Sequence, residues 1–254
     1  MSLDENPLPG KSAPATRAAI AVDGAVAAIT PLPEPMPGVA LWWCALDTPV
    51  PSVRALEALL SDAERTRAAR FGTEALRERY VVGRASLRSV LGAALGLPAD
   101  AVPIVRGERG RPRLGERAGG GAAALDFNLS HTSGAAMIGV ASGVRIGVDI
   151  ERRDRAVNAA GLVRKFLSAA ERAHFDGLDT DAARQRVLQL WTCKEAMSKA
   201  TGDALSAPFA ALTVDIANEP RLRDGPTPYV PARWELRSAH APAAFFATVA
   251  LWRP

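Results

Sequence analysis

The chain has 254 residues, of which 48% are hydrophobic, and a formal net charge of +4. This length allows one large domain or two small ones, with enough apolar side chains for a buried core. The modest positive charge suits an acidic ligand or an acidic protein partner and does not require nucleic acid.

Cysteine content and hydropathy exclude further classes of protein. Cys44 and Cys193 are too few for a disulfide framework, and their spacing does not suit zinc. No segment reaches the roughly 18 uninterrupted apolar residues that a membrane span requires. The N-terminus lacks the basic region and apolar run of a signal peptide. We therefore expect a soluble, cytoplasmic protein that binds no membrane.

The chain divides into three predicted regions. Residues 1–37 are rich in Ala and Pro, which predicts a partly flexible N-terminal extension, although 19–29 could add a short strand. Residues 38–143 and 144–254 each mix helices with strands. We expect an N-terminal and a C-terminal α+β half, with each sheet small and mostly antiparallel.

In the first half, the pattern predicts a buried strand at 39–46, followed by two helices. The spacing of Ser61 and Glu64 is that of a capping box, so a helix should begin there. A longer helix is expected over 73–95, ending at Gly96. Its apolar face is predicted to hold Leu76, Tyr80, Leu87, Leu91 and Leu95.

Strands and a hairpin complete the first half. Short strands are predicted at 102–105 and 125–129, on either side of a Gly-rich turn region at 107–121. Residues 135–141 and 144–150 are predicted to pair as a hairpin around the turn at Ser142 and Gly143.

The second half repeats these kinds of element. Ser168 and Glu171 have capping-box spacing and should open a helix that continues to about residue 175. A helix is expected over 181–201, with Gly202 ending it. Strands are predicted at 212–216, 233–237 and 245–251.

Carboxylates gather on the strand that opens this half. Val144, Ile146, Val148 and Ile150 alternate with polar residues or glycine, so Asp149 and Glu151 point the same way. In the helix at 181–201, Trp191, Glu195 and Lys199 recur at four-residue spacing and share one face. If strand and helix meet, three carboxylates lie beside two lysines, Lys194 and Lys199, which predicts a hard-cation site next to phosphate-binding cations.

Lysine usage supports phosphate chemistry. The positive charge is carried almost wholly by arginine, with lysine only at Lys11, Lys165, Lys194 and Lys199. Lys194 and Lys199 flank Glu195, and an ammonium is a compact charge that suits a phosphate. The alternative is an ordinary solvated helix with Glu195 and Lys199 as a surface pair. No general base adjoins Cys193, so we expect Cys193 to pack in the core.

In order and spacing, six segments of the chain resemble the Sfp-type 4′-phosphopantetheinyl transferases. The resemblance covers about residues 61–205. The matching segments are 83–85, 110–114, 127–131, 147–151, 166–168 with Glu171, and 191–199.

The resemblance implies a fold and an activity. The fold would be two similar α+β halves related by a pseudo-twofold axis, with coenzyme A and Mg²⁺ in the cleft between them. The reaction would transfer 4′-phosphopantetheine from coenzyme A to a serine hydroxyl of an apo acyl or peptidyl carrier protein, releasing adenosine 3′,5′-bisphosphate. A monomeric enzyme of the holo-[acyl-carrier-protein] synthase type is expected. Mn²⁺ should substitute for Mg²⁺, because it too accepts an all-oxygen shell.

The resemblance also assigns roles at the reacting phosphates. Asp149, Glu151 and Glu195 would be the metal ligands, and Glu195 would take the proton of the attacking serine. Lys199 would neutralise the pyrophosphate, with Lys194 beside the same phosphates.

The 3′-phosphate of coenzyme A would have its own partners. His131 is placed there, with Ser130 beside it. Arg67, Arg84 and Arg111 are further candidates, although Arg111 stands where relatives often have lysine. Trp191 and Phe166 are expected to pack, and Glu171 to cap its helix.

Two other functions fit parts of the pattern. A metal-dependent phosphohydrolase acting on a nucleotide pyrophosphate could use the same carboxylates and lysines with water as nucleophile. A non-enzymatic adaptor could bind an acidic helical partner through its arginines.

Overall fold

Two antiparallel sheets pack against each other in the middle of the computed structural model, which describes residues 29–47, 53–107, 109–115 and 125–254. The larger sheet has the strand order β1-β2-β6-β5 and the smaller one the order β10-β11-β7, while β3-β4 and β8-β9 form separate pairs. Every pairing is antiparallel. The strands are β1 (Ile29–Leu32), β2 (Val39–Ala45), β3 (Ile104–Arg106), β4 (Pro112–Leu114), β5 (Leu125–Thr132), β6 (Ala135–Ser142), β7 (Arg145–Arg152), β8 (Thr213–Asp215), β9 (Arg221–Asp224), β10 (Trp234–Ser238) and β11 (Phe245–Trp252).

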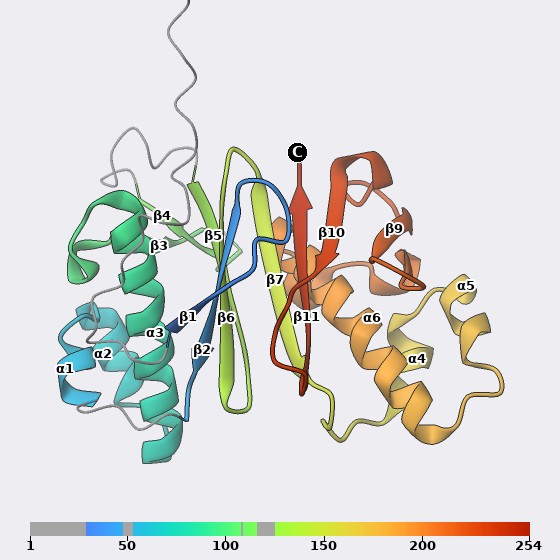
Figure 1. The fold of residues 1–254 in the computed structure, drawn as a ribbon, viewed down its shortest axis with the longest axis horizontal. Coiled ribbons are helices and arrows are strands. Elements are labelled where there is room, and N and C mark those ends of the chain that lie inside the picture. Colours follow the sequence, from blue (N-terminus) through green and yellow to red (C-terminus); the bar gives the residue numbers. More distant parts are fainter. Residues whose placement is uncertain (1–28, 48–52, 108, 116–124) are drawn as a thin grey trace, which may run out of the picture.

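Helices cover the outer face of each sheet (Figure 1). Beside the larger sheet lie α1 (Val53–Glu57), α2 (Asp62–Ala68) and α3 (Glu74–Leu95), and beside the smaller sheet lie α4 (Ala159–Phe166), α5 (Ala169–Arg172) and α6 (Thr180–Thr201). Short 3-10 turns occur at Ala99–Ala101, Ala173–Phe175, Ala204–Ser206, Phe209–Ala211 and Pro231–Arg233. The predicted α+β class, with small antiparallel sheets packed against helices, is confirmed.

Strand alternation explains this layering. In β6, Met137 faces the smaller sheet, whereas Ile138 faces α3 and packs with Leu87. In β7, Ile146 and Val148 pack between the two sheets. The side chains of alternate residues point to opposite faces of a strand, so each sheet can bury one face against the other sheet and one against helices.

Local sequence signals set the ends of the two long helices. Thr73 accepts a hydrogen bond from the Leu76 N–H, and Gly96 ends α3 at φ 67°, a left-handed conformation that glycine adopts without strain. Gly202 ends α6 in the same way at φ 87°. These helix bounds are confirmed to within a residue. Leu76 is 46% exposed, so its predicted place on the buried face is wrong.

Both predicted capping boxes are present. Ser61 and Glu64 exchange side-chain-to-backbone hydrogen bonds at the start of α2, and Ser168 and Glu171 do the same at α5. Each box satisfies two backbone N–H groups that the helix leaves without partners, which stabilises the helix start by about 1 kcal/mol.

The predicted hairpin at 135–150 is wrong. β6 and β7 follow one another in sequence, but β6 pairs with β5 and β2 while β7 pairs with β11. The turn at Gly143 therefore carries the chain from one sheet to the other. Alternation shows which residues of a strand share a face, but it does not specify the partner strand.

Five elements were not predicted or were misplaced, of which α1 has no counterpart in the predicted pattern. β1 lies inside the predicted N-terminal extension, whose residues 1–28 are outside the described residues. β4 lies inside the predicted turn region, of which 108 and 116–124 are also outside them. β9 and α4 were missed, because short segments carry little periodicity.

Side chains of β5 connect the two sheets along a shared seam. Asp126 Oδ2 accepts a hydrogen bond from the Ile146 N–H at 2.8 Å, and Asn128 Oδ1 accepts one from the Val148 N–H at 3.0 Å. Polar side chains thus take the place of a backbone ladder between β5 and β7. The two halves of the chain are joined at a line of hydrogen bonds that continues into the candidate site.

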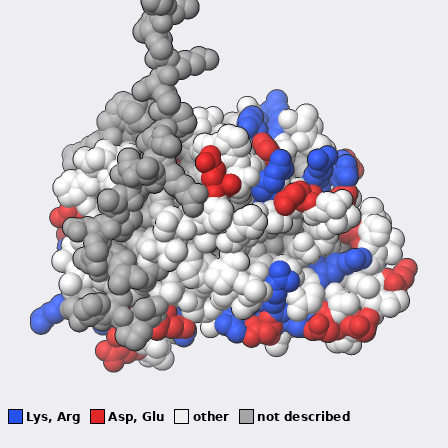
Figure 2. Space-filling model, viewed as in Figure 1, with Lys and Arg blue, Asp and Glu red and all other residues white. Residues whose placement is uncertain are grey.

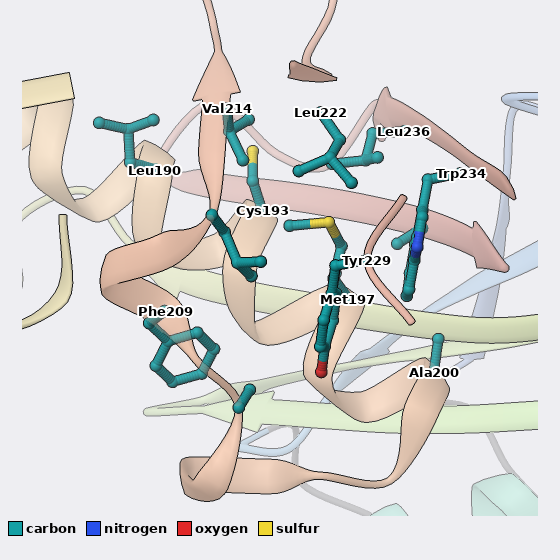
Figure 3. Packing of buried hydrophobic residues seen from close by; sticks show 14 of the residues in the cluster. Leu190, Cys193, Met197, Ala200, Phe209, Val214, Leu222, Tyr229, Trp234 and Leu236 are labelled. Atoms are coloured by element: carbon teal, nitrogen blue, oxygen red, sulfur yellow. The ribbon is translucent and has the colours of Figure 1, made fainter. Parts of the chain in front are cut away.

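A second core lies under α6 (Figure 3). Cys193 and Met197 project from the helix among Leu222, Leu236 and Trp234. Burial raises the pKa of the Cys193 thiol to about 12, so this residue packs in the core as predicted. Within the described residues, no helix is long and apolar enough to cross a membrane.

Candidate functional site

β7 and α6 bring the predicted carboxylates and Lys199 together. Gly147 makes this possible, because a Cβ built there would lie 1.9 Å from the Ala196 carbonyl oxygen of α6. The helix therefore lies directly on β7 at this glycine. Two residues further along the strand, and so on the same side of the sheet, Asp149 faces the same helix.

Lys199, Asp149 and Ser130 form the centre of the site. Lys199 Nζ lies 2.5 Å from Asp149 Oδ1 and 2.8 Å from Ser130 Oγ, and the Ser130 hydroxyl donates to Asp149 Oδ1 at 2.8 Å. Asp149 is 4% exposed, whereas the Lys199 side chain is 26% exposed. The ammonium is the part of this cluster that can meet a ligand.

Glu195 completes the group one helical turn before Lys199. The pKa of its carboxyl group is raised to about 7, mainly by burial and then by the charges of Asp149 and Glu151, while Lys199 lowers it. The raised pKa places proton exchange by Glu195 near neutral pH, which suits a general base.

Glu151 is held by two neighbours. Thr132 donates a hydrogen bond to Glu151 Oε2 at 3.2 Å, and Arg155 forms an ion pair with Oε1. Burial raises the pKa of Glu151, against the attraction of Arg155, and Asp149 adds to the rise. The charge of Asp149 thus raises the pKa of both Glu151 and Glu195.

The donor chemistry of this cluster fits a hard divalent cation. Among the described residues, nothing donates to Asp149 Oδ2 or Glu195 Oε1, although both oxygens are buried. Buried carboxylate oxygens without partners are costly, and a cation would satisfy them. In the same residues, no three His, Cys, Asp or Glu side chains converge as a ready-made metal site. Lys199 and Arg155 instead lie against two of the carboxylates.

His131 and Arg67 form a separate positive region beside this centre. His131 is exposed at the end of β5, next to Ser130. The pKa of its imidazole is lowered by partial burial and then by the positive charges of Lys199 and Arg67. Arg67 is also exposed and lies over the Tyr80 ring, 5.5 Å from its centroid. These two side chains remain candidates for the 3′-phosphate.

The prediction that Lys194 contacts phosphate is wrong. Its side chain is 1% exposed and forms an ion pair with Glu171 at 2.6 Å. Its ammonium also donates to the carbonyl oxygens of Phe166, Phe209 and Leu212. An ammonium has three protons, so these acceptors leave none for a phosphate. Glu171 therefore caps α5, as predicted, and also neutralises a buried lysine.

Arg111 is also placed differently from the prediction. Its guanidinium, 8% exposed, makes a two-pronged salt bridge with Asp126 at 2.8 and 2.7 Å. It also donates to the Lys199 carbonyl oxygen at 2.7 Å and the Ile146 carbonyl oxygen at 2.6 Å. The charge predicted for a coenzyme A phosphate is thus neutralised inside the protein.

Arg84 and Ser130 likewise have internal partners. Arg84 pairs with Glu64, a carboxylate that Arg88 also contacts. The one proton of the Ser130 hydroxyl is used by Asp149. The charge of Arg84 is thus paired inside the protein, and Ser130 has no second proton to donate to a 3′-phosphate.

Aromatic packing fixes the first part of α6. Phe166 and Trp191 meet edge to face, with centroids 4.9 Å apart, and both contact Phe209. The predicted packing role of Trp191 and Phe166 is confirmed.

Three polar residues of the seam and site were not predicted from the sequence. Asp126, Asn128 and Thr132 alternate with Phe127 and Leu129 along β5. The same period-two pattern that revealed Asp149 and Glu151 could have identified them.

Charged groups on the visible face are mixed in sign. Figure 2 shows basic and acidic side chains interleaved over the C-terminal half of the chain. This surface offers no block of one charge to a partner, which gives no support to an adaptor that works by broad charge attraction.

Two family models match the chain. Residues 145–249 match the 4′-phosphopantetheinyl transferase superfamily, and residues 49–143 match the N-terminal region of 4′-phosphopantetheinyl transferases.

Named relatives agree with these models. The chain is 36% identical to the 4′-phosphopantetheinyl transferase HetI of Nostoc sp., over 66% of this chain and 70% of the relative. It is 27% identical to the 4′-phosphopantetheinyl transferase psf-1 of Bacillus pumilus, over 74% of this chain and 79% of the relative. It is 31% identical to the 4′-phosphopantetheinyl transferase AcpT of Escherichia coli K12, over 50% of this chain and 58% of the relative.

Proposed function

The chain belongs to the 4′-phosphopantetheinyl transferase family, whose reaction transfers phosphopantetheine to carrier proteins, and from this premise we propose how its own residues carry out that transfer. The donor is coenzyme A and the acceptor is a serine hydroxyl of an apo acyl or peptidyl carrier protein. Asp149, Glu151 and Glu195 hold a Mg²⁺ ion, for which Mn²⁺ can substitute.

One observation carries this proposal. Lys199 and Glu195, one turn apart on α6, both lie against Asp149 on β7, and two buried carboxylate oxygens there have no donor among the described residues. A pyrophosphate needs cations, and a divalent ion needs carboxylates. When bound, the ion supplies charge neutralisation at the pyrophosphate.

Glu195 and Lys199 act on the two sides of the reaction. Glu195 accepts the proton of the carrier serine as its oxygen bonds to the β-phosphorus of coenzyme A. The bond from that phosphorus to the bridging oxygen breaks, and adenosine 3′,5′-bisphosphate leaves with the electron pair. Lys199 stabilises the negative charge on the pyrophosphate oxygens, because its side chain is the more exposed partner of the pair with Asp149.

The 3′-phosphate is bound at the positive region of His131 and Arg67. Support comes from the electrostatic effect of Arg67 on the pKa of His131 and from the exposure of both side chains. The guanidinium donates charge-assisted hydrogen bonds to phosphate, and the imidazole donates one through its N–H, while the negative charge of a bound phosphate opposes the lowering of the His131 pKa.

We also propose that residues 38–143 and 144–254 are two similar halves related by a pseudo-twofold axis, with coenzyme A between them. The seam supports a site between the halves, since Ser130 of the first half meets Asp149 of the second. The strand β1 extends the first half to residue 29. The enzyme is proposed to be a monomer of the holo-[acyl-carrier-protein] synthase type.

The test is incubation with coenzyme A and a panel of apo carrier proteins, followed by the mass of each carrier. The expected result is a phosphopantetheine adduct on a carrier serine with Mg²⁺ or Mn²⁺, and no adduct with a chelator. Consumption of coenzyme A without a carrier would instead indicate the phosphohydrolase.

A further inference from the structure

Arg111 lies where four parts of the molecule meet. It precedes β4, and its guanidinium bonds to β5 through Asp126, to β7 through the Ile146 carbonyl oxygen, and to α6 through the Lys199 carbonyl oxygen. Asp126 in turn accepts from the Ile146 N–H at 2.8 Å. Arg111 and Asp126 together therefore hold both backbone polar groups of Ile146.

The bond to Lys199 has a specific role at the end of α6. The last carbonyl groups of a helix have no partner within it. The Asp203 N–H, which a longer helix would direct at the Lys199 carbonyl, donates instead to Thr201 Oγ1 at 3.2 Å. Arg111 Nε supplies the missing donor at 2.7 Å. Gly202 lies so close that a Cβ there would be 3.6 Å from Arg111 Cβ.

The same residue therefore fixes the backbone of Lys199 and the strand that carries Asp149. We propose that Arg111, clamped by Asp126, is a positioning residue that sets the Lys199 ammonium against the Asp149 carboxylate, rather than a ligand for coenzyme A. This inference rests on the proposed function. A lysine at position 111 would keep the charge but lose the planar fork that reaches Asp126, Ile146 and Lys199 together.

Two phosphopantetheine donors distinguish the two roles. Coenzyme A and 3′-dephospho-coenzyme A differ only in the 3′-phosphate, so a residue that binds this phosphate discriminates between them. For Arg111→Lys, we expect kcat to fall about tenfold or more with both donors, and the ratio of their kcat/KM values to stay within about twofold of the parent. His131→Ala should instead reduce the ratio of kcat/KM for coenzyme A to kcat/KM for 3′-dephospho-coenzyme A.

Two further variants separate positioning from general loss of structure. Asp126→Asn leaves Arg111 in place but removes the charge that orients it, so it should lower kcat in the same donor-independent way. Arg113→Lys is the matched control, because Arg113 is exposed on β4 and bonds only to its neighbour's carbonyl group among the interactions described. It should keep parental kcat. Rates are normalised to the folded fraction from circular dichroism.

The outcomes are distinct. If Arg111→Lys or Asp126→Asn lowers the donor ratio as His131→Ala does, Arg111 serves the 3′-phosphate and the inference is overturned. The inference is also overturned if both variants keep the parental kcat. It is overturned as well if the Asp126→Asn protein is soluble and loses activity only in proportion to its unfolded fraction. If the parent itself modifies no carrier, the proposed function fails first.

Discussion

Lys199 Nζ lies 2.5 Å from Asp149 Oδ1, while Oδ2 of the same carboxylate is buried without a donor among the described residues. The lysine thus holds one oxygen of the carboxylate that we propose binds the metal, and the second oxygen is left for the ion. Lys199 is more exposed than Asp149, so it can turn toward a phosphate when the ion neutralises the carboxylate.

Replacing Asp149 should remove activity without unfolding the protein. Asp149→Asn keeps the shape of the side chain and can still bond to Ser130, but it loses the charge that a metal requires. We expect kcat to fall by roughly 100-fold or more, with the melting temperature within about 5 °C of the parent. Steady-state kinetics and thermal unfolding followed by circular dichroism measure both. An unfolded variant whose folded fraction works at the parental rate would make Asp149 structural.

Glu195 should make stability depend on pH in the absence of metal. Its pKa is raised to about 7 in the folded protein from 4.5, so the folded state keeps a proton that the unfolded chain releases in this range. The stability contributed by protonation is complete below pH 4.5 and is lost as pH rises through about 7. Glu195→Gln cannot ionise, so its advantage over the parent should grow between about pH 5 and pH 8. Because the carboxyl is partly exposed, the gain should be about 1–2 kcal/mol.

Urea unfolding in a chelator at both pH values measures this difference. Glu235→Gln is the matched control, since Glu235 is a surface carboxylate paired with Arg237 on β10. The difference in unfolding free energy between Glu235→Gln and the parent should be similar at the two pH values. An equal effect of Glu195→Gln at both pH values would show that Glu195 is not held protonated near neutrality.

The site was predictable from sequence where chemistry follows a regular spacing. Period-two alternation placed Asp149 and Glu151 on one face of β7, and four-residue spacing placed Glu195 and Lys199 on one face of α6. That spacing does not include Lys194, whose predicted place beside the phosphates came from the family resemblance. Its neighbour Glu195 faces the site, but Lys194 lies one position earlier on the helix, and its direction depends on Glu171 and on carbonyl groups of distant loops. These partners come from segments far away in the sequence, so residue spacing within one helix cannot predict them.

Lys194→Met should therefore weaken folding and leave coenzyme A binding intact. Removing one partner of a buried ion pair leaves Glu171 charged and uncompensated, which costs about 3–5 kcal/mol. We expect that loss in urea unfolding, with KM for coenzyme A in the folded fraction close to parental. If the variant instead has parental stability and a raised KM for coenzyme A, Lys194 contacts the phosphates of coenzyme A.

Gly147→Ala should separate β7 from α6. The added Cβ would lie 1.9 Å from the Ala196 carbonyl oxygen and 2.7 Å from the Ala200 nitrogen, and both are backbone atoms that cannot turn away. Overpacking costs about 1–3 kcal/mol or more, and a shifted α6 would also move Lys199 from Asp149. We expect lower stability together with lower kcat. Gly72→Ala is the control, because a Cβ at Gly72 meets nothing within 4 Å.

The fold was predicted less completely than its elements. Caps and periodicity gave both long helices, since those signals lie within each helix. The assignment of β6 and β7 to different sheets was missed, because it depends on the hydrogen bonds that Asp126 and Asn128 make to β7. Those bonds join residues about 20 positions apart, and no local pattern records them.

The most direct test of the account is the rate at which Glu195→Gln modifies an apo carrier protein, measured by carrier mass across coenzyme A and Mg²⁺ concentrations. The substitution keeps the size of the side chain but removes a proton acceptor and a negative ligand. We predict that kcat falls roughly 100-fold or more, that KM for coenzyme A stays within about threefold, and that added Mg²⁺ recovers only part of the rate. Turnover close to the parental rate would contradict the account, because the face of α6 that meets Asp149 would then not be the one that carries out the reaction.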